Sequence, residues 1–169
     1  MIGEYIEALS TENLYEIGYY LKLLKDIPDS LRCFASHTTT LASLFLFQYC
    51  HYIEDNPIVW RHLATVRDHE SARYHYYYCR YIKDRPVIRR ALATDTRPMA
   101  AKYQYHYCLR INDIDEMWQA LARHRNKKAA YYQYVYLRYV KERPEIIEAL
   151  KSNPNTKHYL DMLKHHKRR

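Results

Sequence analysis

Apolar, acidic and aromatic residues recur along this chain at a constant interval. An apolar position recurs at Leu24, Ile53, Ile82, Ile111 and Val140. An acidic position follows two positions later in each copy, at Asp26, Asp55, Asp84, Asp113 and Glu142. A tyrosine holds one position in all five copies, at Tyr20, Tyr49, Tyr78, Tyr107 and Tyr136. The interval is about 29 residues, and a fixed period of about 20–50 residues is typical of stacked-repeat proteins. The pattern therefore predicts a single domain over residues 1–169 built from tandem copies of one unit.

The period places five repeats at residues 14–42, 43–71, 72–100, 101–129 and 130–158. Residues 1–13 do not match the repeat, and residues 159–169 match only the beginning of a sixth copy. The ends of a stacked-repeat protein must cover an exposed core face. We therefore expect residues 1–13 to be an N-terminal cap and residues 159–169 to be a C-terminal cap with a basic tail.

Each repeat contains two predicted helices, which are clearest in the third copy. The stripe of the first helix, over residues 72–83, has the i, i+3/i+4, i+7 spacing of a helix: Ala72, His75, Tyr76, Cys79 and Ile82. Pro86 suits the first turn of a second, shorter helix that runs to about Thr94, because its missing N–H has no partner there in any case. Asp84 can accept hydrogen bonds from the amides of that turn, so the acidic position is expected to cap the second helices. The predicted fold class is an all-α, right-handed α-solenoid of five helix-turn-helix repeats.

This arrangement resembles the helical-hairpin solenoids, the broad class that includes tetratricopeptide and HEAT repeats. The resemblance covers about residues 14–158 and concerns architecture only. The period is shorter than in either family, and the W-x-x-L-G pattern of tetratricopeptide repeats is missing. The resemblance implies a long surface that binds a partner, but it assigns no binding residue to this sequence.

Cys50, Cys79 and Cys108 share one position of the repeat, where the fifth copy has Leu137. A position that accepts both Cys and Leu indicates packing, because a thiol behaves as a small apolar group. Stacked helices lie about 8–10 Å apart, farther than a disulfide allows. No apolar run is long enough to span a bilayer, and the N-terminal residues lack the pattern of a signal peptide. We therefore expect a protein of the reducing cytoplasm that is not attached to a membrane.

The formal net charge of +8 is unevenly distributed. Residues 1–30 hold two lysines and six carboxylates, whereas the rest of the chain holds 25 Lys and Arg against 13 Asp and Glu. Many of these cations lie in the second helices and links: Arg61, Arg67, Arg89, Arg90, Arg97, Arg123, Arg125, Lys127 and Lys128. A basic body indicates an anionic partner, either nucleic acid or an acidic protein.

Fourteen of the 20 tyrosines fall in four positions of the first helix, those of Tyr74, Tyr76, Tyr78 and Tyr81. One interpretation is an exposed ladder of rings on which bases stack. The other is packing against the first helix of the next copy, with the hydroxyl reaching water or a carboxylate. Packing is favoured for the invariant position of Tyr78, and both interpretations stay open for the other three.

The face of the first helix that varies most between copies mixes aromatic and cationic side chains. The predicted binding residues are Arg73, Arg80, Arg89, Arg90, Lys102 and Arg138 for phosphates, with Tyr77 and His106 for bases. A single strand is favoured over a duplex because exposed rings need unstacked bases.

Candidate catalytic and metal sites are weak in this sequence. The pairs Cys33/His37 and His75/Cys79 have the i, i+4 spacing of two metal ligands, but neither has a second pair nearby in the sequence. With only two glycines, and no HExxH or nucleophile–base pattern, neither an enzyme nor a cofactor is predicted.

The predicted function is non-enzymatic binding of single-stranded RNA or DNA. The alternative is a protein-interaction scaffold for an acidic peptide or protein, of which self-association into a homo-oligomer is a variant.

Overall fold

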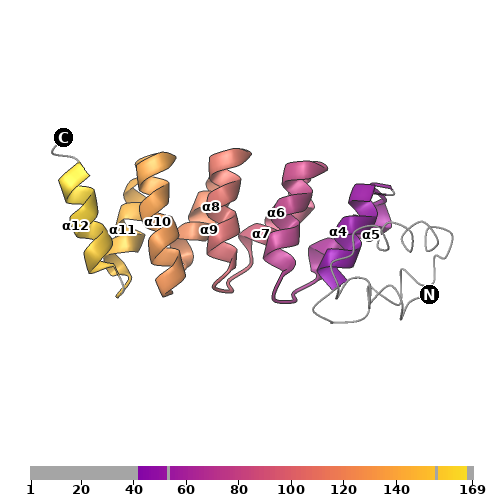
Figure 1. Ribbon diagram of the computed structural model, residues 1–169, viewed down its shortest axis with the longest axis horizontal. Helices are drawn as coiled ribbons and strands as arrows, with labels where there is room; N and C mark the ends of the chain where they lie inside the picture. The colour runs from indigo at the N-terminus through magenta and orange to yellow at the C-terminus, as the bar shows by residue number, and fades with distance from the viewer. Residues whose placement is uncertain (1–41, 53, 155, 167–169) are drawn as a thin grey trace. The chain divides into compact units, whose positions relative to one another are not determined.

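The computed structural model describes residues 42–52, 54–154 and 156–166, and every regular element in these ranges is an α-helix (Figure 1). The helices are α4 (Ala42–Tyr52), α5 (Pro57–Thr65), α6 (Ser71–Tyr81), α7 (Pro86–Ala93), α8 (Ala100–Arg110), α9 (Asp115–Arg123), α10 (Lys127–Tyr139), α11 (Pro144–Ser152) and α12 (Lys157–His166). The all-α fold class is therefore confirmed for this part of the chain. The predicted N-terminal cap, most of the first repeat and the end of the basic tail lie outside the described residues.

The helix positions follow the sequence period closely. The first helix predicted over residues 72–83 is α6, and the second helix predicted to begin at Pro86 is α7. Helices α4, α6 and α8 begin at the same position of the period, at Ala42, Ser71 and Ala100. Proline occupies the first turn of α5 and α11, as expected from its fixed φ. Below, α4, α6, α8, α10 and α12 are called first helices, and α5, α7, α9 and α11 second helices.

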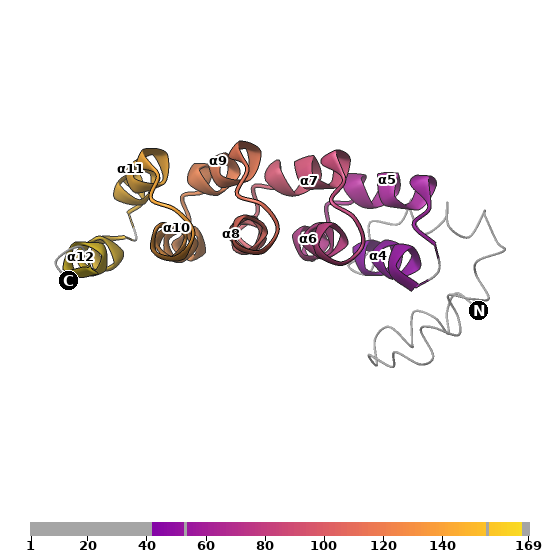
Figure 2. The same cartoon turned by 90° about the horizontal axis from the view of Figure 1, so that it is seen from above.

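The chain forms two compact units, Met1–Ile88 and Arg89–Arg169. In the N-terminal unit, α4 packs against both α5 and α6. In the C-terminal unit, α8 packs against α10 and α10 against α12, while α9 packs against α11. The first helices of this unit thus lie side by side in one layer, and α9 and α11 form a second layer behind them (Figure 2).

The core of each unit lies between the two helices of each hairpin. A leucine is fully buried at one position of each second helix: Leu63, Leu92, Leu121 and Leu150. The invariant tyrosine is also buried in every described copy, at Tyr49, Tyr78, Tyr107 and Tyr136. Burying a side chain of this size stabilises the fold by about 1.5–3 kcal/mol. Ile82, placed on the core stripe by the sequence, ends α6 as its C-cap and is only half-buried, so that apolar position lies at the edge of the core.

The cysteine position is buried at Cys50, Cys79 and Cys108, which confirms its interpretation as a packing position. Burial raises the pKa of the Cys50 thiol to about 12, with help from the nearby carboxylate of Asp55. Burial likewise raises the pKa of Cys108, again with help from the neighbouring Asp113. Because the thiolate is the reactive form, these two side chains are inert packing groups near neutral pH.

A buried polar side chain on a first helix caps the end of the second helix before it. Gln104 donates through Nε2 to the carbonyl oxygens of Leu92 (3.0 Å) and Asp95 (3.1 Å). The equivalent residue of the next copy, Gln133, donates to the carbonyl oxygens of Leu121 and His124, both at 3.0 Å. The last carbonyls of a helix have no partner within it, so these bonds satisfy buried acceptors and join one hairpin to the next.

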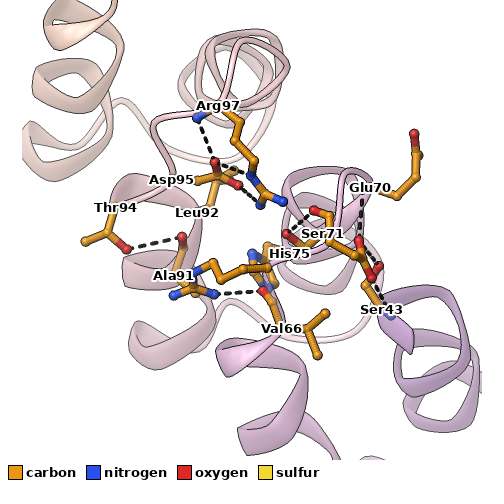
Figure 3. Close-up of polar contacts among 12 residues, drawn as sticks. Ser43, Val66, Glu70, Ser71, His75, Ala91, Leu92, Thr94, Asp95 and Arg97 are labelled. Carbon is orange, nitrogen blue, oxygen red and sulfur yellow. Dashed lines mark hydrogen bonds and ion pairs between the residues drawn. The ribbon is translucent and has the colours of Figure 1, made fainter. Parts of the chain in front are cut away.

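In the N-terminal unit, His75 takes this position, and its Nε2 lies 2.7 Å from the carbonyl oxygen of Leu63. The link before α6 is held separately by Asp68. Its carboxylate accepts hydrogen bonds from the Ser43 hydroxyl and amide, at 2.9 and 3.1 Å, and from the Glu70 amide, at 2.9 Å (Figure 3). In the C-terminal unit, the buried Asp95 carboxylate accepts from the backbone amide and side chain of Arg97 (Figure 3).

The acidic position does not cap the second helices at Asp55 or Asp113, so that prediction is wrong there. The N-cap of α5 is Asn56, whose side chain accepts from the Ile58 amide at 2.9 Å. The N-cap of α9 is Ile114, which makes no side-chain cap bond. The carboxylates of Asp55 and Asp113 instead bind the next hairpin.

Each of these carboxylates belongs to a clamp of four side chains. In the C-terminal unit, Asp113 accepts from the Tyr136 hydroxyl and from Arg143 Nη2, both at 2.7 Å, and Arg143 Nε donates to the Tyr136 oxygen at 2.7 Å. The Arg143 guanidinium also lies 4.5 Å from the ring centre of Trp118. The N-terminal unit contains the same clamp, two copies earlier in the sequence, with Asp55, Trp60, Tyr78 and Arg85.

Candidate functional site

Four first helices, α4, α6, α8 and α10, contain no aspartate or glutamate. Three of them carry at least two Lys or Arg: Arg73 and Arg80 on α6, Lys102 and Arg110 on α8, and Lys127, Lys128 and Arg138 on α10. The carboxylates of the described chain lie in the links, in the second helices and, as Asp161, on α12. The sides of α6, α8 and α10 that face away from the core are therefore aromatic and cationic.

In the N-terminal unit, α6 brings Arg73 and Tyr77 together, as the sequence predicted for one face. The Arg73 guanidinium lies 5.3 Å from the Tyr77 ring centre, and its Nη1 is 3.3 Å from Glu70 Oε2. The Tyr77 ring also contacts Phe47 of α4 at 6.0 Å and the edge of Tyr81 at 5.6 Å. Tyr81 is 59% exposed. Tyr77 is thus half-buried, and Tyr81 beside it is the more exposed ring.

Arg80, the third predicted residue on α6, is exposed. It follows Tyr77 by three positions, which places both on neighbouring turns of the same helix face. The three predicted residues of α6 are therefore close together.

In the C-terminal unit, ring contacts run across three helices. The His106 ring of α8 lies 6.3 Å from Tyr132 of α10, and Tyr132 contacts its neighbour Tyr131 edge-on at 5.1 Å. Tyr131 in turn lies 6.2 Å from Tyr159 of α12. We call His106, Tyr132, Tyr131 and Tyr159 the ring strip. Of these four residues, sequence reasoning selected only His106 as a binding residue.

The electrostatic surroundings keep His106 uncharged near neutral pH. Burial lowers the pKa of its imidazole, and the cations Arg110 and Lys102, one turn to either side, lower it further. A neutral imidazole can stack on a base or accept a hydrogen bond without adding charge to the strip.

The other predicted cations of the C-terminal unit fall into two layers. Lys102 lies 5.4 Å from the Tyr103 ring on α8, and Arg138 lies 5.0 Å from the Tyr139 ring near the end of α10. Arg89 and Arg90 belong to α7, a second helix, where they lie 3.4 and 3.7 Å from the carboxylate of Glu116 on α9. The structure therefore does not group Arg89 and Arg90 with Lys102 and His106.

The four tyrosine positions separate clearly by burial. The invariant position is buried in every described copy, so packing is confirmed there and a stacking ladder is excluded. The positions of Tyr74 and Tyr76 are also mostly buried, although Tyr132 is half-buried. The position of Tyr81 is exposed wherever the described chain has tyrosine there: Tyr52, Tyr81 and Tyr139. Sequence reasoning did not single out these exposed rings, although their position as the last residue of a first helix could have identified them.

Within the described ranges, no group of three or more His, Cys, Asp and Glu side chains is arranged to hold a metal ion. The Cys33/His37 pair lies outside those ranges, and the His75 and Cys79 side chains are buried in the helix packing. In the same part of the chain, no helix is long and apolar enough to cross a membrane.

The chain matches no protein-family model, no curated protein and no solved structure.

Proposed function

We propose that this protein binds single-stranded nucleic acid through the solvent-facing sides of its first helices and catalyses no reaction. The observation that carries the proposal is the absence of carboxylates from α4, α6, α8 and α10, combined with cations on the last three and exposed rings on α6 and α10. A solvated helix face usually mixes both signs of charge. A face without acids attracts polyanions, and its rings offer stacking surfaces for bases.

The predicted binding residues divide between the first helices and the second helices. Arg73, Arg80, Lys102 and Arg138 lie on first helices and would hold phosphates. Tyr77 and His106 lie beside them and would contact bases. Arg73, Arg89 and Arg90 are weaker members of the set, because a carboxylate beside each competes with phosphate. This carboxylate is Glu70 for Arg73 and Glu116 for the other two.

We propose further that the five sequence copies stack as one right-handed α-solenoid. This is supported by the packing of α8, α10 and α12 in order, by the packing of α4 against α6, and by the recurrence of the same buried contacts in both units. A solenoid would carry the acid-free helices along one continuous surface. The buried thiols at Cys50, Cys79 and Cys108 support a reducing compartment such as the cytoplasm.

The proposal is tested by fluorescence anisotropy with labelled single-stranded RNA, single-stranded DNA and duplex DNA over a range of salt concentrations. We expect the single strands to bind more tightly than the duplex. The logarithm of the association constant should fall by about 0.7 per phosphate contacted for each decade of salt.

Polyglutamate serves as a control, since it offers negative charge without bases. If it displaces the single strands at equal charge concentration, the surface recognises charge alone, and the alternative of an acidic protein partner replaces the proposal. Failure of every nucleic acid to bind at low salt would also contradict it.

A further inference from the structure

The ring contacts of the C-terminal unit run in order across three neighbouring helices. They pass between helices, from His106 of α8 to Tyr132 and Tyr131 of α10 and on to Tyr159 of α12, with ring centres 5.1–6.3 Å apart at each step. The helices themselves pack in the same order. The strip therefore crosses the helix axes and does not follow any one of them.

Two lysines lie beside the ring strip, one on α8 and one on α10. Lys102 precedes His106 by four positions on α8, and Lys128 precedes Tyr132 by four positions on α10. Side chains at this spacing share a helix face, so each lysine lies one turn before a ring of the strip. Lys128 is exposed, and its Nζ reaches back to Met99 Sδ at 3.1 Å, at the start of α8. Two adjacent helices thus present a cation and a ring in the same order.

The rings of the strip are held in place but still reach solvent. Tyr131 is 46% exposed, and its edge-on contact with Tyr132 fixes the ring orientation. Tyr159 is half-buried and stacks on the buried Tyr134 at 5.3 Å. A ring that is already oriented loses little conformational entropy when a base stacks on it. Sequence-tolerant stacking of this kind is how proteins hold single strands.

We propose that a single nucleic-acid strand crosses the C-terminal unit from α8 to α12 along the ring strip. Its bases stack on Tyr131, Tyr132 and Tyr159, and its phosphates lie at Lys102 and Lys128. This inference rests on the proposed function and adds its path and its contacts.

The test uses the full chain and labelled single-stranded oligouridylate. The double variant Tyr131→Ala/Tyr159→Ala should weaken binding by about tenfold or more, since it removes two stacking rings. The control is Tyr52→Ala, which removes a ring that is 59% exposed on α4, a first helix without Lys or Arg. It should change affinity by less than about twofold.

Two further variants keep the test decisive if the alanine variant loses its fold, which a thermal melt would reveal. Tyr131→Phe/Tyr159→Phe keeps both rings and should retain the affinity. Lys102→Gln/Lys128→Gln should lower the slope of log affinity against log salt by about 0.7 for each lysine.

The outcomes separate the inference from the proposed function. If the wild-type chain binds the single strand and neither the folded alanine variant nor the lysine variant binds more weakly, the strand lies elsewhere and the path is wrong. Equal losses from Tyr52→Ala and from the double variant would also overturn the path. If the wild-type chain binds no single strand at all, the proposed function itself fails.

Discussion

Tyr136 donates its phenolic hydrogen to the carboxylate of Asp113, at 2.7 Å, although the two side chains belong to neighbouring hairpins. Tyr78 makes the same contact with Asp55 in the N-terminal unit. In both places an arginine bridges the pair and lies against a tryptophan of the preceding hairpin. At these two positions the invariant tyrosine therefore joins neighbouring hairpins, which explains why its side chain is buried and unavailable to a ligand there.

Tyr136→Phe should lower the free energy of unfolding. The variant keeps the ring but removes a donor to a carboxylate, and hydrogen bonds to charged groups contribute about 1.5–3 kcal/mol. Urea unfolding followed by circular dichroism measures the loss. Tyr139→Phe, at an exposed position of the same helix, is the control and should leave the midpoint unchanged. Equal midpoints for wild type and Tyr136→Phe would show that the clamp does not stabilise the fold.

His75→Gln should leave stability unchanged or raise it. Glutamine occupies the same position at Gln104 and Gln133, where Nε2 donates to two carbonyl oxygens. His75→Leu instead leaves the buried Leu63 carbonyl without this partner and should cost about 1–3 kcal/mol. The two variants are compared by thermal unfolding. The explanation fails if the glutamine and leucine variants lose the same stability.

The free energy of unfolding should fall as the pH is lowered through the ordinary histidine range. Burial lowers the pKa of His124, and Arg125 lowers it further while Asp95 opposes the shift. Burial also lowers the pKa of His106. The unfolded chain therefore takes up protons at a higher pH than the folded chain, so acid favours unfolding.

The contribution of His124 to this pH dependence can be isolated. His124 Nε2 lies 3.0 Å from Gln104 Oε1, so the neutral ring donates to that oxygen. Asn153 occupies the same position one copy later, which makes His124→Asn a conservative test. Urea titrations at several pH values should show a weaker acid destabilisation for this variant. An unchanged pH dependence would place the responsible groups elsewhere.

Leu121→Ala should destabilise the chain by about 2–5 kcal/mol, because Leu121 is fully buried and the substitution leaves a cavity. Ile111→Ala should cost clearly less, since Ile111 is a half-buried C-cap of α8 at the core edge. Denaturant midpoints rank the two. Equal or reversed losses would contradict the assignment of the core to the leucine position.

The period of the sequence predicted the helices because each copy repeats the same local requirements. Pro86 marks the beginning of α7, and the spacing from Ala72 to Cys79 marks the buried side of α6. The acidic position was misread because helix capping is a local interaction. The partner of Asp55 is Tyr78, which is distant in the sequence, and only the packing of α6 against the preceding hairpin brings them together.

The candidate site was only partly predictable for a related reason. Tyr131 and Tyr159 occupy different positions of the repeat, so no single sequence position connects them. They meet because α10 packs against α12. Arg89 was grouped with Lys102 by its charge, although the two lie on helices of different layers. Sequence reasoning selected residues by the type of their side chain but could not assign each one to a surface.

The most direct test of the proposed function is to purify the protein from cells in low salt and in high salt and to compare its absorbance at nucleic-acid and protein wavelengths. We expect a high nucleic-acid ratio in low salt that falls to the value for protein alone in high salt, because counterions displace the bound strand. A ratio for protein alone in both preparations, together with a stoichiometric protein partner, would contradict nucleic-acid binding and favour the protein-interaction alternative.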